Sequence, residues 1–249
     1  MKTLKVLSAL LAYPSADLVA ATDELKGALL AERVIPRQQL EAVLRLIDEM
    51  AQGDLYDLQE RYMLLFDRTR SLSLHLFEHV HGESRDRGQA MVDLLKLYEE
   101  AGYLPTATEL PDYLPLFLEF AAEQAPAAAL DLVGQPGHVF AALKERLDKR
   151  QSSYAAVFSA LIALSKAKLD EAALNALRAE PDPEPDDLEA LDAAWEEEEV
   201  TFGPGAALDC GKEGLMAKLR HARRPAPGVA APAAQGPRVQ VTTSLSSRN

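Results

Sequence analysis

Hydrophobic residues recur at helical spacing along most of the chain. One clear case is a segment that Gly53 is placed to end, where the apolar positions follow i, i+3, i+4, i+7 as Leu40, Val43, Leu44 and Ile47. No segment shows the sustained two-residue alternation, rich in Val, Ile and Thr, that predicts strands. The pattern therefore predicts an all-α protein.

Residues with known preferences for helix ends divide this pattern into elements. Residues 17–34 read as one helix that Pro36 ends. Asp54 is placed to cap the next helix, and Ser84 to cap the helix that follows a turn at Gly82. These positions give each helix a defined start.

Three further signals lie in the middle of the chain. Gly102 is placed to end a helix in the left-handed conformation. Pro115 fits a helix only in its first turn, so that helix starts near Asp112. Residues 134–137, Gly-Gln-Pro-Gly, predict a break between helices. The apolar positions predicted to face the core include Leu55, Leu58, Tyr62, Leu65, Phe66, Met91, Leu94, Leu95, Tyr98, Leu114, Phe117, Leu118, Ala121, Phe140, Leu143, Leu147, Tyr154, Val157, Phe158, Leu161 and Ile162.

Composition supports a soluble protein without disulfides. The 249 residues are 48% hydrophobic and 26% charged, and no apolar run approaches the about 18–20 residues of a membrane span. Lys5 interrupts the apolar opening segment, so an amphipathic first helix is favoured over a signal peptide; its face is Leu4, Leu7, Ser8 and Leu11. The single cysteine, Cys210, permits no internal disulfide, and we place the protein in the cytoplasm.

Charge and proline content divide the chain into three parts. The net charge is −13, with −19 on residues 1–211 and +6 on 212–249. An acidic body argues against nucleic acid and suits a basic peptide partner. We predict a helical body over 1–178, an acidic Pro-rich segment over 179–221 with a short helix around Trp195 before a Gly-rich loop, and a disordered basic tail over 222–249.

One string matches a metal motif. His75, Glu78 and His79 fit the H-x-x-E-H pattern of inverted zinc peptidases, in which two imidazoles on one helix face hold zinc and the glutamate acts as general base. Such a site needs a third protein ligand, and none stands out. Nucleotide-binding glycine motifs and nucleophile elbows are absent, and Cys210 has no distinctive His partner. We therefore expect no enzyme activity, no metal and no cofactor.

The segment 66–103 contains the most unusual chemistry. Its centre, residues 82–88, places charges of both signs in seven positions beside Phe77, His79 and His81. One interpretation is a helix–turn–helix whose exposed charges pair with one another. The other is a surface that binds a peptide through apolar and charged contacts. Composition leaves both open.

Three blocks of the sequence resemble a known family, and the longest of them is residues 76–94, LFEHVHGESRDRGQAMVDL. This block looks like the signature of the NarJ family of assembly chaperones, also called the nitrate reductase delta subunit. Residues 109–119, ELPDYLPLFLE, resemble the E-x-P-D-H-L-P motif shared with the wider TorD/DmsD chaperones, with Tyr113 where the family often has His. Residues 191–198, LDAAWEEE, are similar to the family's W-E-E run. Order and spacing agree, so the resemblance covers about residues 3–205.

The resemblance implies a single-domain, all-α helical bundle of the TorD/DmsD-like type. It implies a cytoplasmic, non-catalytic chaperone that binds the apo catalytic subunit of respiratory nitrate reductase, including its N-terminal segment. The chaperone would keep that subunit competent for insertion of the molybdenum cofactor and iron–sulfur clusters before membrane attachment. The alternatives are a chaperone for another molybdoenzyme or a twin-arginine leader and, more remotely, the zinc peptidase.

A binding groove for the client peptide is expected between residues 66–77 and 112–116. Each expected contact competes with a structural role, since an aromatic ring can belong to the core and a charge can pair within the chain. Phe66 and Phe77 would be apolar anchors, and Tyr113 would stack or hydrogen-bond. The remaining expected contacts are the acids Asp67, Glu78 and Asp112, the bases Arg85 and Arg87, and the rings of His79 and His81.

Overall fold

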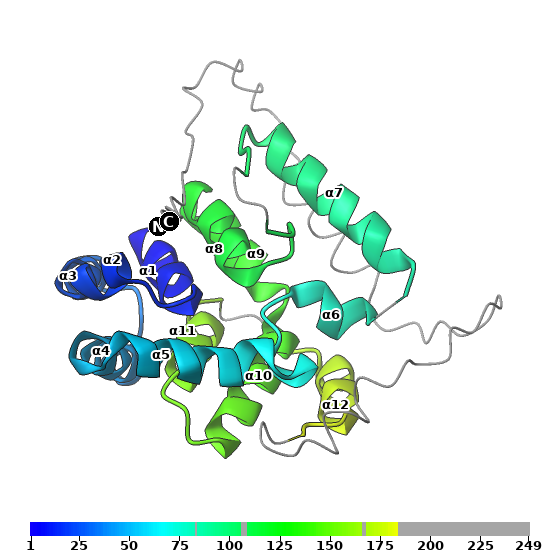
Figure 1. Ribbon diagram of the computed structural model, residues 1–249. Helices are drawn as coiled ribbons and strands as arrows, with labels where there is room; N and C mark the ends of the chain where they lie inside the picture. The colour runs from blue at the N-terminus through cyan, green and yellow to red at the C-terminus, as the bar shows by residue number, and fades with distance from the viewer. Residues whose placement is uncertain (83, 106–108, 166–167, 184–249) are drawn as a thin grey trace, which may run out of the picture.

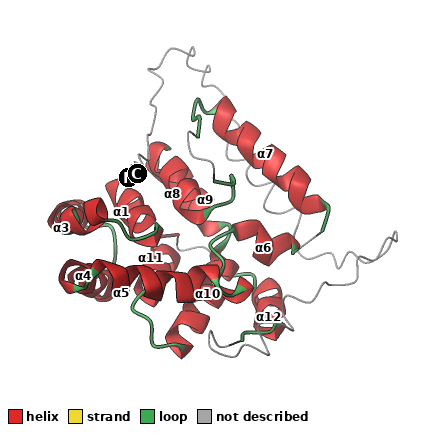
Figure 2. Ribbon diagram, viewed as in Figure 1, coloured by secondary structure: helices red, strands yellow, loops and turns green. Residues whose placement is uncertain are grey.

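The computed structural model describes residues 1–82, 84–105, 109–165 and 168–183, and its regular structure there is helical (Figures 1 and 2). The all-α prediction is confirmed. A π-helix, Met63–Asp67, continues α5, and a short 3-10 helix covers Arg70–Leu72. The α-helices are α1 Lys2–Leu11, α2 Ala16–Ala20, α3 Thr22–Glu32, α4 Arg37–Gln52, α5 Leu55–Tyr62, α6 Leu76–His81, α7 Asp86–Glu100, α8 Leu114–Glu123, α9 Pro126–Gly134, α10 Gly137–Lys149, α11 Ala155–Ser165 and α12 Glu171–Ala179.

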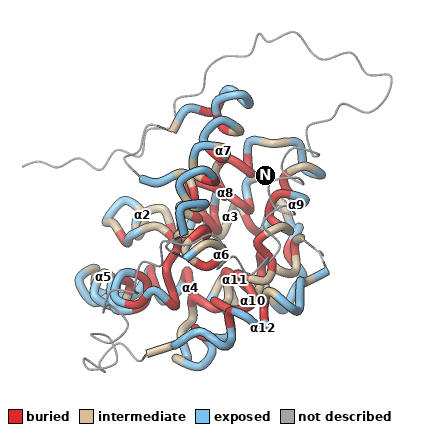
Figure 3. The backbone as a smooth tube through the Cα atoms, turned by 90° about the vertical axis from the view of Figure 1, so that its right-hand side faces the viewer, coloured by how far each residue is buried: buried red, intermediate tan, exposed pale blue. Residues whose placement is uncertain are grey.

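Two helix pairs form the centre of the bundle. Helix α1 packs along α8, and α10 packs along α11. Helix α9 contacts both α8 and α11 and so joins the pairs, while α4 covers α11 and α12 covers α10. The tube view shows the buried positions concentrated on these central helices (Figure 3). The largest fully buried side chains are Tyr98, Tyr154, Phe77, Phe120, Phe140 and Phe158.

Helix α7 lies at the edge of the bundle, where it runs along one side of the molecule beyond α6 (Figure 1). It buries Ala90, Leu94 and Tyr98 but leaves Val92 and Leu95 exposed. The predicted apolar face of this helix is therefore confirmed at Leu94 and Tyr98 and wrong at Leu95.

Most of the predicted helix ends are confirmed. The side chain of Asp54 accepts a hydrogen bond of 2.9 Å from the backbone N–H of Tyr56 at the start of α5. Gly102 has φ +77 after α7, and Pro115 lies in the first turn of α8. Residues 134–137 separate α9 from α10. The first helix is amphipathic as expected, because all four residues of its predicted face are buried.

Two predicted boundaries were wrong. Residues 17–34 form two helices rather than one, with a break at Ala21. The hydroxyl of Thr22 donates to the carbonyl of Val19 (2.9 Å), a local side-chain bond that competes with a continuous helix. Ser84 does not cap α7: Arg85 is its N-cap residue, and no side-chain cap bond is present.

The predictions for the C-terminal third are only partly covered. Helix α12 and residues up to 183 belong to the described part of the chain. The short helix expected around Trp195, the Gly-rich loop and the disordered tail lie outside the described residues. Within the described ranges, no helix is long and apolar enough to cross a membrane.

Candidate functional site

Two backbone segments that are far apart in sequence meet beside the starts of α6 and α8. His75 and Tyr113 form a single antiparallel bridge. The N–H of Leu76 donates to the carbonyl of Asp112 (3.1 Å), and the N–H of Leu114 donates to the carbonyl of Leu74 (2.8 Å). The bridge joins two of the three blocks of sequence that carry the resemblance, residues 76–94 and 109–119. We refer to His75, Asp112 and Tyr113 as the bridge site.

Asp112 is fully buried and holds the site together. One carboxylate oxygen accepts the backbone N–H of Phe77 (3.0 Å), and the other lies 3.2 Å from Nδ1 of His75. Phe77 lies in the first turn of α6, where backbone N–H groups have no partner within the helix. Asp112 therefore caps α6 from a different segment of the chain, a role that sequence spacing alone does not indicate.

His75 lies between this buried carboxylate and the solvent. Its side chain is 26% exposed, and its ring centroid lies 5.5 Å from that of Tyr113. The hydrogen bond to Asp112 raises the pKa of His75, and burial of the ring opposes this only in part. Protonated His75 would thus carry a positive charge at the partly open edge of the bridge site.

Tyr113 connects the bridge site to a row of aromatic rings. Its hydroxyl oxygen lies 3.3 Å from that of Tyr62, whose own O–H donates to the carbonyl of Leu11 (2.9 Å). Tyr113 is therefore the donor in the pair. Burial raises the pKa of the half-buried Tyr113, so the O–H stays protonated. Tyr13 packs edge-on against Tyr62 at 5.5 Å.

The π-helix places two expected contacts on opposite sides. Phe66 is buried against Tyr62 and Tyr154, with ring centroids 4.9 and 5.1 Å away. Asp67 is exposed beside the bridge site. Partial burial of its carboxyl group raises the pKa of Asp67; the charge of His75 opposes this shift and that of Glu109 adds to it. His75 and Glu109 therefore act on the carboxyl group of Asp67 in opposite directions.

Helix α6 holds its aromatic residues mainly toward the core. Phe77 is 2% exposed and meets the half-buried His81 edge-on at 5.4 Å. His79 is buried, and its Nε2 lies 2.8 Å from the carbonyl of Ser73, so this nitrogen carries the proton. Burial lowers the pKa of His79 to about 4, which keeps the ring neutral.

The expected charged contacts are partly used within the chain. Arg87 donates to the carboxylate of Glu78 (2.9 Å), so these two residues neutralise each other across α6 and α7. Arg85 is exposed at the start of α7. The structure thus gathers Asp67, His75 and Tyr113 at one surface, and places Phe66, Phe77, His79 and Asp112 behind it.

Comparison with known proteins identifies the family of this chain. The sequence model of the family described as nitrate reductase delta subunit matches residues 22–160, which include both halves of the bridge site. The chain belongs to the nitrate reductase delta subunit family. This confirms the resemblance that the motifs indicate.

Named members of the nitrate reductase delta subunit family match over most of their length. NarJ of Escherichia coli K12, a nitrate reductase molybdenum cofactor assembly chaperone, is 40% identical over 230 residues, covering 92% of this chain and 95% of NarJ. NarW of the same strain, a probable chaperone of that kind, is 37% identical over 84% of this chain and 87% of NarW. The probable chaperone NarJ of Bacillus subtilis is 35% identical over 65% of this chain and 86% of its own. These relatives are named as chaperones, not enzymes.

The positions of His75 and His79 do not support the interpretation of this segment as a zinc site. His75 precedes α6 in an extended conformation, and its Nδ1 bonds Asp112, while Nε2 of His79 bonds Ser73. Among the described residues, no group of three or more His, Cys, Asp and Glu side chains is placed to hold a metal ion. The hydrogen bonds account for both imidazoles as parts of the fold.

Sequence reasoning missed several residues that build the bridge site. Tyr62 was assigned only to an apolar face, although its hydroxyl orients Tyr113. Ser73 and Leu74 supply the carbonyls that hold His79 and Leu114, and a backbone acceptor leaves no signal in the sequence. The hydroxyl of a tyrosine on an apolar face is a weak signal for the role of Tyr62, because a buried Tyr usually needs a partner for its O–H.

The buried His79 gives a testable pH dependence. Its pKa is about 4 in the folded protein and about 6.5 when unfolded, so its contribution to stability is complete above about pH 6.5 and decreases as the pH falls toward 4. Between pH 7 and pH 5 we expect a loss of about 2 kcal/mol in the free energy of unfolding from this group. Urea unfolding of the wild type and of His79→Gln at both values measures it. An equal pH effect in both proteins would contradict the assignment.

Proposed function

We propose that this chain is an assembly chaperone for the molybdenum cofactor of a nitrate reductase. The observation that carries this proposal is the 40% identity to NarJ, which extends over 92% of this chain and 95% of NarJ. Identity over nearly the whole of both chains favours a shared task over a shared module. The protein acts as a binding protein and does not become part of the finished enzyme.

The proposed client is the apo catalytic subunit of respiratory nitrate reductase, bound in the cytoplasm at least through its N-terminal segment. Binding keeps that subunit competent to receive the molybdenum cofactor and iron–sulfur clusters before membrane attachment. The acidic body of the chain, −19 over residues 1–211, suits a basic segment of the client. The chaperone needs no cofactor of its own for this task.

The proposed contact surface is centred on Tyr113 and the exposed groups around it. The ring of Tyr113 would contact the apolar face of the client, together with two exposed apolar side chains. These are Leu64, in the π-helix that contains Asp67, and Leu110, in the segment that leads to Tyr113. Asp67 would meet its basic residues, and Arg85 its acidic ones. Phe66, Phe77 and Asp112 support this surface from the core. Micromolar affinity requires about −8 kcal/mol, which a few such apolar contacts can largely supply.

Calorimetric titration with the N-terminal peptide of the catalytic subunit tests this proposal. We expect saturable binding that a scrambled peptide does not show. Tyr113→Ala should weaken binding about tenfold, the smaller of the usual effects for a central aromatic contact, and Tyr113→Phe should retain most of it. Tyr56→Ala is the matched control, because Tyr56 is 80% exposed on the first turn of α5.

The outcome separates the proposed client from its alternatives. Binding unaffected by Tyr113→Ala would remove Tyr113 from the contact surface. If the wild type binds neither peptide, a pull-down from nitrate-respiring cells identifies the client; recovery of another molybdoenzyme or a twin-arginine leader would replace nitrate reductase in the proposal.

A further inference from the structure

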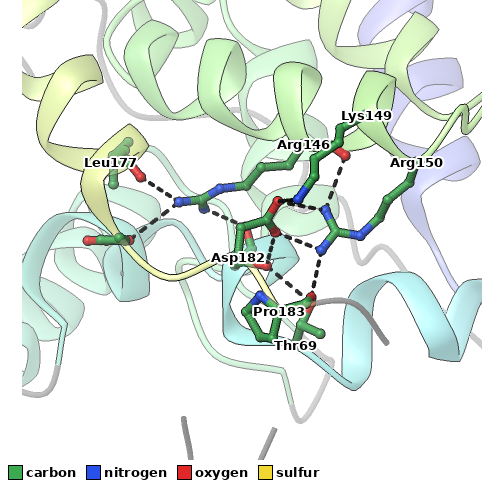
Figure 4. Close-up of polar contacts among 9 residues, drawn as sticks. Thr69, Arg146, Lys149, Arg150, Leu177, Asp182 and Pro183 are labelled. Atoms are coloured by element: carbon green, nitrogen blue, oxygen red, sulfur yellow. Dashed lines mark hydrogen bonds and ion pairs between the residues drawn. The ribbon is translucent and has the colours of Figure 1, made fainter. Parts of the chain in front are cut away.

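After α12 the chain turns back onto the body and is held there by polar contacts. We refer to residues 177–183 as the strap; it includes the end of α12 and continues to Pro183 (Figure 4). Two arginines contact it: Arg146 of α10 and Arg150, the residue directly after α10 (Figure 4). The family match ends at residue 160, so the strap lies outside the matched region while both arginines lie within it.

Asp182 is the centre of these contacts. The guanidinium of Arg150 donates two hydrogen bonds, of 2.6 and 3.1 Å, to the carboxylate of Asp182. The hydroxyl of Ser71 donates a third, of 2.8 Å, to the same carboxylate. The Nζ atom of Lys149 lies 3.4 Å from Oδ2 of Asp182, and Arg150 also donates to the carbonyl of Pro183 (2.8 Å). Burial alone would raise the pKa of Asp182, but the bonds from Arg150 and Ser71 and the nearby positive charges outweigh burial and lower it. The carboxylate is therefore ionised at neutral pH.

Arg146 joins the strap to a second segment. The side chain of Arg146 is 7% exposed. Its guanidinium donates to the carbonyl of Leu177 at the start of the strap (2.5 Å) and to the carbonyl of Ser71 (2.7 Å). Ser71 is thus held twice, through its carbonyl by Arg146 and through its hydroxyl by Asp182. The two arginines lie one helical turn apart, and through these hydrogen bonds they hold the strap against the loop that contains Ser71.

That loop, residues 69–75, leads directly into the bridge site. The carbonyl of Ser73 accepts the ring N–H of His79, and the carbonyl of Leu74 accepts the N–H of Leu114. His75 is the last residue of the loop and the bonding partner of Asp112. Hydrogen bonds therefore connect the strap to Ser71, and the backbone of the loop connects Ser71 to the residues that shape the bridge site.

Arg146 also lies 3.7 Å from the carboxylate of Glu180 in the strap, whereas the ion pair of the buried Arg150 with the strap is made with Asp182. The side chain of Arg150 is 6% exposed and that of Asp182 is 17% exposed. A buried charge that loses its partner is costly, so Arg150 without Asp182 should reorient toward water rather than keep its place.

We propose that residues 177–183 are a strap that fixes loop 69–75, with Arg146, Arg150 and Asp182 as positioning residues for the bridge site. When the strap detaches, the loop loosens, and with it the carbonyls that hold His79 and Leu114. The strap itself stands on the contacts above; its effect on client binding rests on the proposed function. Residues 177–183 thereby control the shape of the proposed client surface.

Hydrogen exchange of the full-length chain tests the strap without any client. In Asp182→Asn, we expect amides of residues 69–76 and 177–183 to exchange about tenfold faster, as the loss of one buried charged hydrogen-bond partner implies. Asp148→Asn is the matched control, because Asp148 lies on α10 with Arg146 but pairs with the partly exposed Lys144. It should change neither segment. Faster exchange of 177–183 alone would overturn the proposal, because the strap would then not fix the loop.

A second variant covers the case in which Asp182→Asn is too unstable to study. Ser71→Ala removes one hydroxyl without changing the charge, and we expect the same two segments to exchange faster by a smaller factor. No change in 177–183 would overturn the link through Ser71. Calorimetry with the N-terminal peptide then shows whether Asp182→Asn weakens binding; a wild type that does not bind this peptide contradicts the proposed client but leaves the exchange result for the strap intact.

Discussion

Phe77→Ala is expected to lower the free energy of unfolding by about 3–5 kcal/mol, the usual cost of removing a buried phenylalanine ring. Phe77 is 2% exposed, lies in the first turn of α6 and packs against His81. Removing its ring leaves a cavity where the helix meets the core. Urea unfolding followed by circular dichroism measures the loss. Tyr56→Ala, at a position 80% exposed on a neighbouring helix, should stay within about 0.5 kcal/mol of the wild type.

This expectation refines the role that the sequence suggests for Phe77. A groove anchor would lose client affinity on truncation and keep its stability, whereas a core residue loses stability first. Phe77→Leu helps to separate the two roles, because it keeps an apolar side chain, leaves a smaller cavity than Phe77→Ala and should therefore cost less stability. If Phe77→Ala leaves the unfolding midpoint unchanged and only weakens peptide binding, the core assignment is wrong and Phe77 is an anchor.

The sequence predicts most of the fold because the determining signals are local. Asp54, Gly102 and Pro115 act through residues within one turn of themselves, and the structure confirms all three. The apolar face of α10 is confirmed for the same reason, since Phe140, Leu143 and Leu147 lie on one side of a single helix. Such features depend on spacing, which can be read directly.

The features that the sequence did not reveal depend on long-range partners. No periodic signal in the sequence marks the π-helix at residues 63–67 or the break at Ala21, and none marks the strap. Asp112 illustrates the limit most clearly: the motif identifies it as a contact for the client, but its carboxylate caps a helix that begins 36 residues earlier in the chain. A buried carboxylate and an exposed one look the same in sequence.

Asp112→Ala should therefore reduce stability more than the loss of an ordinary helix cap. Asp112 is fully buried, and its truncation leaves the buried N–H of Phe77 and the ring of His75 without their acceptor. We expect a loss of about 3–5 kcal/mol in urea unfolding, the usual cost of breaking a buried charged pair. Asp54→Ala is the matched control, because Asp54 caps α5 at the surface and should cost only about 1 kcal/mol.

The same substitution predicts a change in how stability depends on pH. The pKa of His75 is raised by Asp112, so the stabilisation from this pair is complete below about pH 6.5 and is lost as the pH rises through the folded pKa of His75. Asp112→Asn keeps an acceptor but removes the charge. Its stability deficit against the wild type should therefore be larger at pH 6 than at pH 8, and nuclear magnetic resonance titration should show the pKa of His75 moving down toward 6.5. A deficit independent of pH, or a loss no greater than that of Asp54→Ala, would mean that the buried carboxylate does not organise the bridge site.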